Sequence, residues 1–173
     1  VGSEFEVNEA NNVGSAAINL TTPLSDLQVT AASISANALT GQVAIVSFTV
    51  SNLGTRDTFA RTWADDVYLS SDGNFDSGDL KLFTVTRTAG LSVGENYSVS
   101  KGWVIPETLP AGNYTIFIRT DRPEALFGGD PFANLEFEGP GEGNNQVSVP
   151  VSIGLGPKAD LIVTNVSAPL MAF

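Results

Sequence analysis

The sequence predicts an all-β fold, an antiparallel immunoglobulin-like β-sandwich of about seven strands. Three observations lead to this prediction. Apolar and polar residues alternate in short runs, clusters of Gly, Pro, Asn and Asp separate those runs, and no window has convincing helical periodicity. Short alternating strands punctuated by turns are typical of β-sandwiches of this kind.

Taken in order, the strands of the sandwich are expected at 26–35, 43–52, from Trp63 to Leu69, and at 80–87, 95–105, 112–121 and 144–153. In the third of these, Trp63, Val67 and Leu69 share one face, with Asp65 among them. In the last, Pro150 indicates an edge strand or one paired on a single side, because proline cannot donate to a ladder.

An internal repeat sets the organisation of the chain. Glu-Ala-Asn-Asn at 9–12 returns as Glu-Gly-Asn-Asn at 142–145, and Asp-Leu-Gln-Val-Thr at 26–30 returns as Asp-Leu-Ile-Val-Thr at 160–164. Two landmarks at nearly the same offset indicate a tandem array. We therefore divide the chain into a vector-derived start (1–5), the last strand of a preceding repeat (6–23), one complete repeat (24–153), and a linker with the first strand of the next repeat (154–173).

Composition excludes several classes of function. The net charge of −11 argues against nucleic acid and anionic membranes as partners, because polyanions recruit Lys and Arg. The chain has no cysteine and no histidine, which removes disulfides, thiol chemistry, His-dependent triads and the commonest transition-metal ligand. No apolar run is long enough to span a bilayer, so no membrane insertion is expected.

An acidic loop follows the Trp63 strand and is the candidate metal site. Asp72, Asn74, Asp76 and Asp79 fall within eight residues, and oxygen side chains at such spacing suit one calcium ion. The loop is not an EF-hand, because Phe83 stands where that loop needs a bidentate Glu. The alternative is a plain hairpin loop, since Asp, Asn and Gly are also the residues that tight turns prefer.

Several of these landmarks resemble one known family. They are Asn52-Leu53-Gly54, the segment from Trp63 to Asp79, and the Glu-Gly-Asn-Asn at 142–145, and they resemble the bacterial cell-adhesion-related domain, CARDB. The resemblance covers 26–153. It implies an immunoglobulin-like sandwich that occurs in tandem in large secreted or surface proteins of bacteria and archaea. The chain departs from the family pattern over 122–143, where a Gly-rich insertion carries four apolar side chains (Leu126, Phe127, Phe132 and Phe137) and several acids.

The functional expectation is a non-catalytic structural and adhesive repeat module, stiffened by calcium and located outside the cell or on its surface. Nothing singles out a catalytic pair among the nineteen acids. The alternative is a carbohydrate-binding module of a secreted enzyme or adhesin, for which the stacking candidates are Trp63, Trp103, Tyr68 and Tyr97, although alternation favours Trp63 as a core residue.

The expected partners are neighbouring repeats of the same chain and a cell-surface polysaccharide or protein. Two apolar stripes add a further expectation, one with Ala16, Ile18 and Leu20, the other with Leu161, Val163 and Val166. Strands with an apolar face and no partner favour edge pairing, so we expect strand-exchanged self-association of this fragment.

Overall fold

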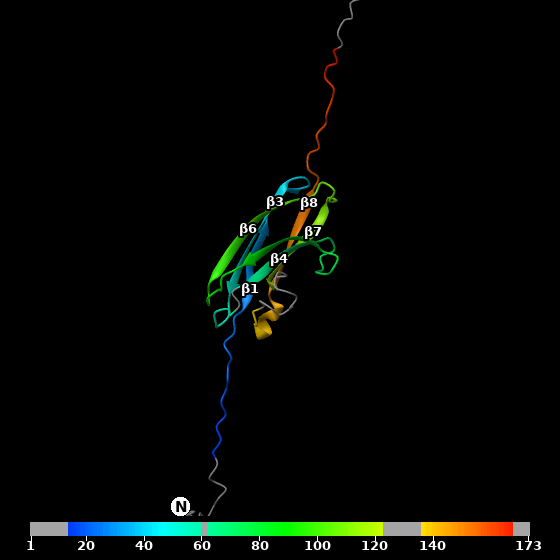
Figure 1. Cartoon of the computed structure of the whole chain (residues 1–173). Helices are drawn as coiled ribbons and strands as arrows, with labels where there is room; N and C mark the ends of the chain where they lie inside the picture. The colour runs from blue at the N-terminus through cyan, green and yellow to red at the C-terminus, as the bar shows by residue number, and fades with distance from the viewer. Residues whose placement is uncertain (1–13, 60–61, 123–135, 168–173) are drawn as a thin grey trace, which may run out of the picture.

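A computed structural model describes residues 14–59, 62–122 and 136–167 of the chain, and it shows a β-sandwich. One sheet has the order β1-β3-β6 and the other the order β2-β8-β7-β4-β5. The strands are β1 (Leu27–Ile34), β2 (Ala38–Leu39), β3 (Val43–Asn52), β4 (Trp63–Ser70), β5 (Leu80–Arg87), β6 (Asn96–Val104), β7 (Gly112–Arg122) and β8 (Gln146–Gly154). Figure 1 shows the sheets packed face to face, and the predicted all-β class is confirmed.

The core lies between the two sheets and follows the alternation of the strands. β3 contributes Val46, Phe48 and Val50, and β4 contributes Trp63 and its same-face neighbours; all of these are buried. β6 packs partly buried side chains against the same cluster, Trp103 and Tyr97 among them. In β3 the burial alternates along the strand, which fixes its register, whereas β4 is buried on both faces.

β8 pairs with β7 along its length, and its other edge carries only a short bridge. That bridge is parallel, with Ala38 opposite Ile153 and Leu39 opposite Gly154. Pro150 pairs with Thr115 of β7 and lies outside the bridged stretch. The structure thus shows β8 paired on a single side at its proline, as the missing N–H of that residue requires.

Two flanking segments differ from expectation. Residues 14–26 and 155–167 form no strand, and the apolar side chains of the predicted stripes are exposed: Ile18 is 77% exposed, Leu20 84% and Leu161 93%. The strands predicted over 16–20 and 159–166 are therefore absent from this chain. A strand needs a partner for its backbone groups, and the repeats to which we assigned these segments are not in the sequence. The division of the chain into repeats stays a prediction.

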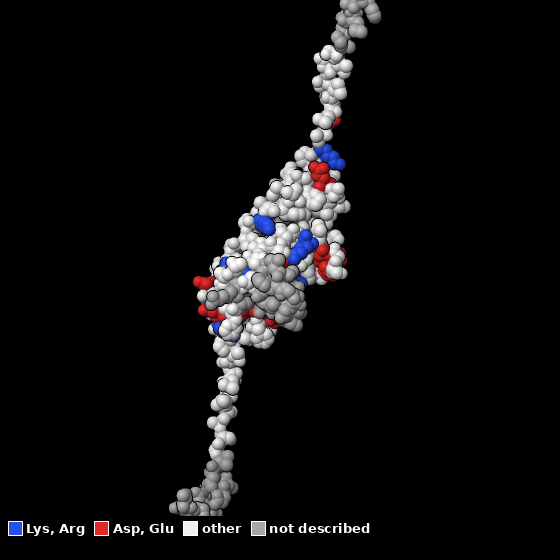
Figure 2. All heavy atoms as spheres, viewed as in Figure 1, with Lys and Arg blue, Asp and Glu red and all other residues white. Residues whose placement is uncertain are grey.

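The flanking segments, called here the N-terminal linker (14–26) and the C-terminal linker (155–167), leave the sandwich at opposite ends (Figure 1). Charged side chains are sparse along them (Figure 2), and the N-terminal linker carries none before Asp26. A 3₁₀ turn, η2 (Gly139–Gly143), precedes β8. Within the described residues, no helix has the length and apolar character needed to cross a membrane.

Candidate metal centre

The end of the sandwich that receives the N-terminal linker contains a concentration of carboxylates, called here the acidic pole. It is formed by Asp121 near the end of β7 and by Glu136, Glu138 and Glu142 from the segment around η2. Asp121 adopts a left-handed conformation with φ of 52°, which Asp tolerates better than most residues. The pairing of β7 with β4 shifts register beside it, between Asp66↔Arg119 and Ala64↔Arg122.

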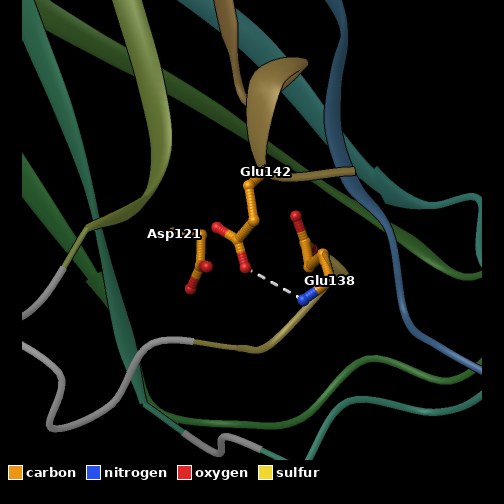
Figure 3. Close-up of side chains that lie close together, drawn as sticks. All are labelled: Asp121, Glu138 and Glu142. Atoms are coloured by element: carbon orange, nitrogen blue, oxygen red, sulfur yellow. Dashed lines mark hydrogen bonds between the residues drawn. The ribbon is translucent and has the colours of Figure 1, made fainter. Parts of the chain in front are cut away.

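Three of these carboxylates converge. Each of Asp121, Glu138 and Glu142 offers an oxygen, and the three oxygens lie within 4.8 Å of one another. Figure 3 shows Glu142 reaching from η2 into the space between Asp121 and Glu138. The backbone N–H of Glu138 donates to Glu142 Oε1 at 3.0 Å, which fixes the two glutamates relative to each other.

Two oxygens of this group are buried without a hydrogen-bond partner. Asp121 and Glu138 are 3% and 2% exposed, and Asp121 Oδ2 and Glu138 Oε2 accept no hydrogen bond from the described protein. A third such oxygen, Asn145 Oδ1, lies at the end of the same segment. Buried polar atoms are nearly always satisfied, so this group of oxygens calls for a partner such as a proton, a water or a cation.

The electrostatics of the acidic pole agree with that interpretation. Burial raises the pKa of Glu138 to about 8, and the charges of Asp121 and Glu142 raise it further, whereas hydrogen bonds from the Leu27 amide and the Asn145 side chain oppose the rise. Burial likewise raises the pKa of Asp121 to about 7, opposed by the hydrogen bond from the Glu136 amide and reinforced by neighbouring carboxylates. The protein alone therefore stabilises the ionised forms poorly, which a bound cation would reverse.

Glu136, also at this pole, is a buried carboxylate whose charge is compensated by the protein itself. It is 1% exposed, and its Oε1 accepts hydrogen bonds from Ser25 Oγ at 2.5 Å and from Arg56 Nη2 at 2.9 Å. The Arg56 guanidinium also stacks on Phe59 at 3.6 Å. Glu136 thus has a cation from the protein, whereas Asp121 and Glu138 have no salt bridge among the described residues.

A fourth buried acid lies deeper, between the sheets. Asp65 is fully buried in β4 and accepts hydrogen bonds from Tyr97 Oη and Thr120 Oγ1, each at 2.7 Å. Trp63 Nε1 donates to the same Tyr97 oxygen at 3.0 Å. Burial raises the pKa of Asp65 to about 6, although both hydroxyls oppose the rise. This network is satisfied within the protein and offers no oxygen to a ligand.

The acids predicted to hold calcium, in the loop between β4 and β5, serve the loop itself. Asp72 Oδ1 accepts from Asn74 N at 2.9 Å and from Ser70 Oγ at 3.0 Å. Asp76 Oδ1 accepts from Gly78 N at 2.7 Å, and Asp79 Oδ2 accepts from Asp76 N at 3.1 Å. These are the short-range bonds of a hairpin loop, which was the alternative interpretation.

The carboxylates of this loop are not among the described groups of three that could share an ion. The backbone hydrogen bonds to Asp72 lower its pKa, so its charge is already stabilised by the loop. Calcium binding by Asp72, Asn74, Asp76 and Asp79 stays a prediction, and the geometry places the stronger candidate elsewhere. The candidate ligands that the sequence did not single out are Asp121, Glu138 and Glu142: Glu138 is among the acids of the insertion at 122–143, and Glu142 belongs to the repeated Glu-Gly-Asn-Asn.

The four aromatic residues considered for carbohydrate stacking do not form an exposed row. Trp63 is fully buried, and Tyr97 and Trp103 pack partly buried against the core. Tyr68, on the outer face of its sheet, is covered by Phe75 of the acidic loop at 5.1 Å between ring centroids. The expectation that Trp63 is a core residue is confirmed.

By its fold, the chain is an immunoglobulin-like β-sandwich module. A model of the CARDB family matches residues 24–125, more than half of the sequence, and the chain belongs to that family. The rest of the sandwich, including Glu138 and Glu142, lies beyond this match.

Solved structures agree on the fold. A crystal structure of a CARDB domain from Pyrococcus furiosus, in complex with di-metal ions, superposes with a TM-score of 0.54 at 19% identity, covering 79% of this chain and all of that one. The solution structure of that domain gives 0.52 at 20% identity, covering 78% of this chain and all of that one. A β-glucosidase from Listeria innocua in complex with glucose gives a TM-score of only 0.46 at 15% identity, over 75% of this chain and 16% of the enzyme. No curated protein matches.

Proposed function

We propose that the chain is a non-catalytic structural and adhesive repeat module whose acidic pole binds a divalent cation, calcium, and is held rigid by it. One observation carries the metal part of this proposal. Two carboxylate oxygens, Asp121 Oδ2 and Glu138 Oε2, are buried without partners in a group that also contains Glu142. A buried carboxylate without a counter-charge is unfavourable, and a cation held jointly with the exposed Glu142 would compensate Asp121 and Glu138 together.

The chemistry of the donors favours calcium. Carboxylate oxygens are hard ligands that suit calcium and magnesium, whereas zinc and copper sites commonly use nitrogen or sulfur. The chain contains no histidine or cysteine to supply those. Calcium accepts six to eight oxygens in irregular arrangements, which suits carboxylates from two separate segments better than the strict octahedron of magnesium. The related domain determined with di-metal ions supports metal binding in this family.

The placement of the linkers supports the structural part. A module whose chain enters at one end and leaves at the other adds its length to a larger protein (Figure 1). The repeated landmarks of the sequence are consistent with tandem copies. We therefore propose neighbouring repeats as intramolecular partners, a secreted or surface-attached bacterial parent protein, and a surface polysaccharide or protein as the target of adhesion.

The described geometry also favours a non-catalytic role. Of the three carboxylates that converge at the acidic pole, Asp121 and Glu138 are buried and only Glu142 is exposed to solvent. A surface pocket lined by Thr40, Glu107 and Lys158 lies at the C-terminal linker, away from those acids. A pocket separated from the perturbed carboxylates does not make a catalytic site.

Calcium titration of the whole chain tests the proposal, with heat of binding and thermal unfolding as readouts. Ligand binding to the folded state raises the free energy of unfolding by about 2.7 kcal/mol at a hundredfold excess over Kd. Asp121→Asn should abolish the binding heat and the calcium-dependent stabilisation while the fold persists in chelator. Asp72→Asn, in the hairpin loop, is the matched control and should retain both. No binding by the native chain would refute the cation site, and loss of binding in the control alone would move the site to the hairpin loop.

A further inference from the structure

The last residues of the N-terminal linker are fastened to the segment that carries the metal ligands. Ser25 Oγ donates to Glu136 at 2.5 Å, and the Leu27 backbone amide donates to Glu138 Oε1. Asn144 Nδ2 donates to Asp26 Oδ1 at 3.0 Å. The segment 136–144 therefore contacts three consecutive positions of the incoming chain.

The opposite side of the linker is held by the turn after β3. Thr55 N donates to the Leu24 carbonyl and Leu53 N to the Asp26 carbonyl, each at 2.7 Å. Gly54 lies so close that a Cβ atom would fall 2.3 Å from the Leu24 oxygen. The linker thus lies between a fixed turn of the sandwich and the segment 136–144.

One side chain serves both the linker and the metal group. Glu138 gives one oxygen to the Leu27 amide, and its other oxygen is buried and unpartnered in the group with Asp121 and Glu142. Asp121 in turn accepts from the Glu136 amide at 3.0 Å, so β7 is also joined to this segment. An ion held by Asp121, Glu138 and Glu142 would therefore tie the segment to β7 at the point where the segment holds the linker.

We propose that cation binding at the acidic pole clamps the N-terminal linker, so that calcium controls the stiffness of the joint between this module and the chain before it. The inference rests on the proposed function and adds its regulation. In the absence of a cation, the buried carboxylates of Asp121 and Glu138 have no counter-charge among the described residues, which disfavours the closed segment. Its opening breaks the hydrogen bonds that the segment makes with Ser25, Asp26 and Leu27. With a cation bound, the same charges favour closure.

Amide hydrogen exchange on the whole chain, measured by NMR with calcium and with chelator, tests the clamp. The reporters are the amide of Leu27, which bonds to Glu138, and the amide of Glu136, which bonds to Asp121. The internal control is the amide of Thr40, which bonds to the Gly154 carbonyl at the other end of the sandwich. If opening releases the ion, exchange at the reporters should slow about a hundredfold at a hundredfold excess of calcium over Kd. Thr40 should change much less.

The outcomes separate the clamp from the metal site. Asp121→Asn should remove the calcium effect on the amides of Leu27 and Glu136, and Asp72→Asn should leave it intact. Calcium binding with unchanged exchange at both reporters would overturn the clamp and leave the metal site standing. Equal slowing at Thr40 and at the reporters would mean general stabilisation and would also overturn it. Absence of calcium binding would refute the metal site and the clamp with it.

Discussion

The carboxylate of Glu138 accepts a hydrogen bond from the backbone amide of Leu27, the first residue of β1, 111 positions earlier in the chain. The bond joins the segment before β8 to the beginning of the sandwich. Because it spans most of the module, the acidic pole is assembled only when both ends of the fold are in place. The stability of the acidic pole therefore depends on the tertiary structure and not on any single local element.

Gly54→Ala should destabilise the sandwich. The new Cβ would lie 2.3 Å from the Leu24 oxygen and 2.6 Å from two backbone carbons of Ser25, so the backbone must shift and weaken the bonds that hold the linker. Overpacking of this kind costs about 1–3 kcal/mol. Denaturant unfolding measures the loss. The matched control is Gly112→Ala, where the new atom meets only Tyr114 at 3.7 Å, and which should stay within about 0.5 kcal/mol of the native chain. Equal stability of the two variants would contradict the tight approach.

Asp65 should make stability fall as the pH rises through the range from about 4 to 6. Its pKa in the folded protein is raised from 3.8 to about 6, so the folded state binds more protons than the unfolded chain in this interval. The favourable contribution is present below the lower value and is lost above the higher one. A rise of this size corresponds to about 3 kcal/mol.

Asp65→Asn isolates this contribution, because an amide has no charge to bury and can still bond the two hydroxyls. The difference in free energy of unfolding between the variant and the native chain should increase in favour of the variant from pH 4 to pH 6.5, with calcium kept saturating. Urea titrations across that interval measure it. A difference that is constant with pH would mean that Asp65 keeps its ordinary pKa.

Substitution of Trp63 should lower the free energy of unfolding and should have no separate effect on retention by carbohydrate. It is fully buried, and its indole N–H bonds Tyr97. Replacing such a side chain by Ala costs about 3–5 kcal/mol, and Trp63→Phe is the milder variant should the first fail to fold. Trp103→Phe, at a partly buried position, should cost less. Retention on insoluble polysaccharides that disappears in Trp63→Phe without loss of stability would instead support the carbohydrate-binding alternative.

The exposed linkers should promote association between copies of this fragment. Ile18 and Leu20 on one side, and Leu161 and Val163 on the other, are between 77% and 93% exposed. Pairing of such segments between copies would bury their apolar side chains and satisfy their backbone groups. Light scattering should show a concentration-dependent mass for the whole chain and a monomer for residues 24–157. Monomers in both cases would contradict the strand-exchange proposal.

The strands could be predicted from the sequence because burial on one face of a strand produces a local alternation of apolar and polar residues. The alternation of Val46, Phe48 and Val50 requires no knowledge of which sheet lies opposite. The same reasoning assigned strands to both linkers, where the alternation is real but no partner is present to complete a ladder. A pattern specifies what a segment can form, and the partner decides whether it forms.

The metal group could not be found in the same way. Asp72, Asn74, Asp76 and Asp79 are close in sequence, so they attracted the calcium assignment, but backbone amides of their own loop take up their oxygens. Asp121 and Glu138 are seventeen residues apart and meet only after β7 and η2 are placed. The sequence did contain one indication of a metal site. Glu136 and Glu138 occupy alternate positions shortly before Glu142, in a long connection that has more acids than its turns require.

The short parallel bridge between β2 and β8 has a mechanical consequence. Tension applied through the two linkers pulls the chain at opposite ends of the sandwich (Figure 1), so β8 is drawn one way and the strands that follow the N-terminal linker the other. For parallel neighbours this is shear, in which the bond from Thr40 N to the Gly154 carbonyl and the bond from Gly156 N to Thr40 Oγ1 are loaded together and not one after another. Load from the N-terminal linker passes first through β1, which is paired with β3, and the two-residue strand β2 would then resist further extension in shear.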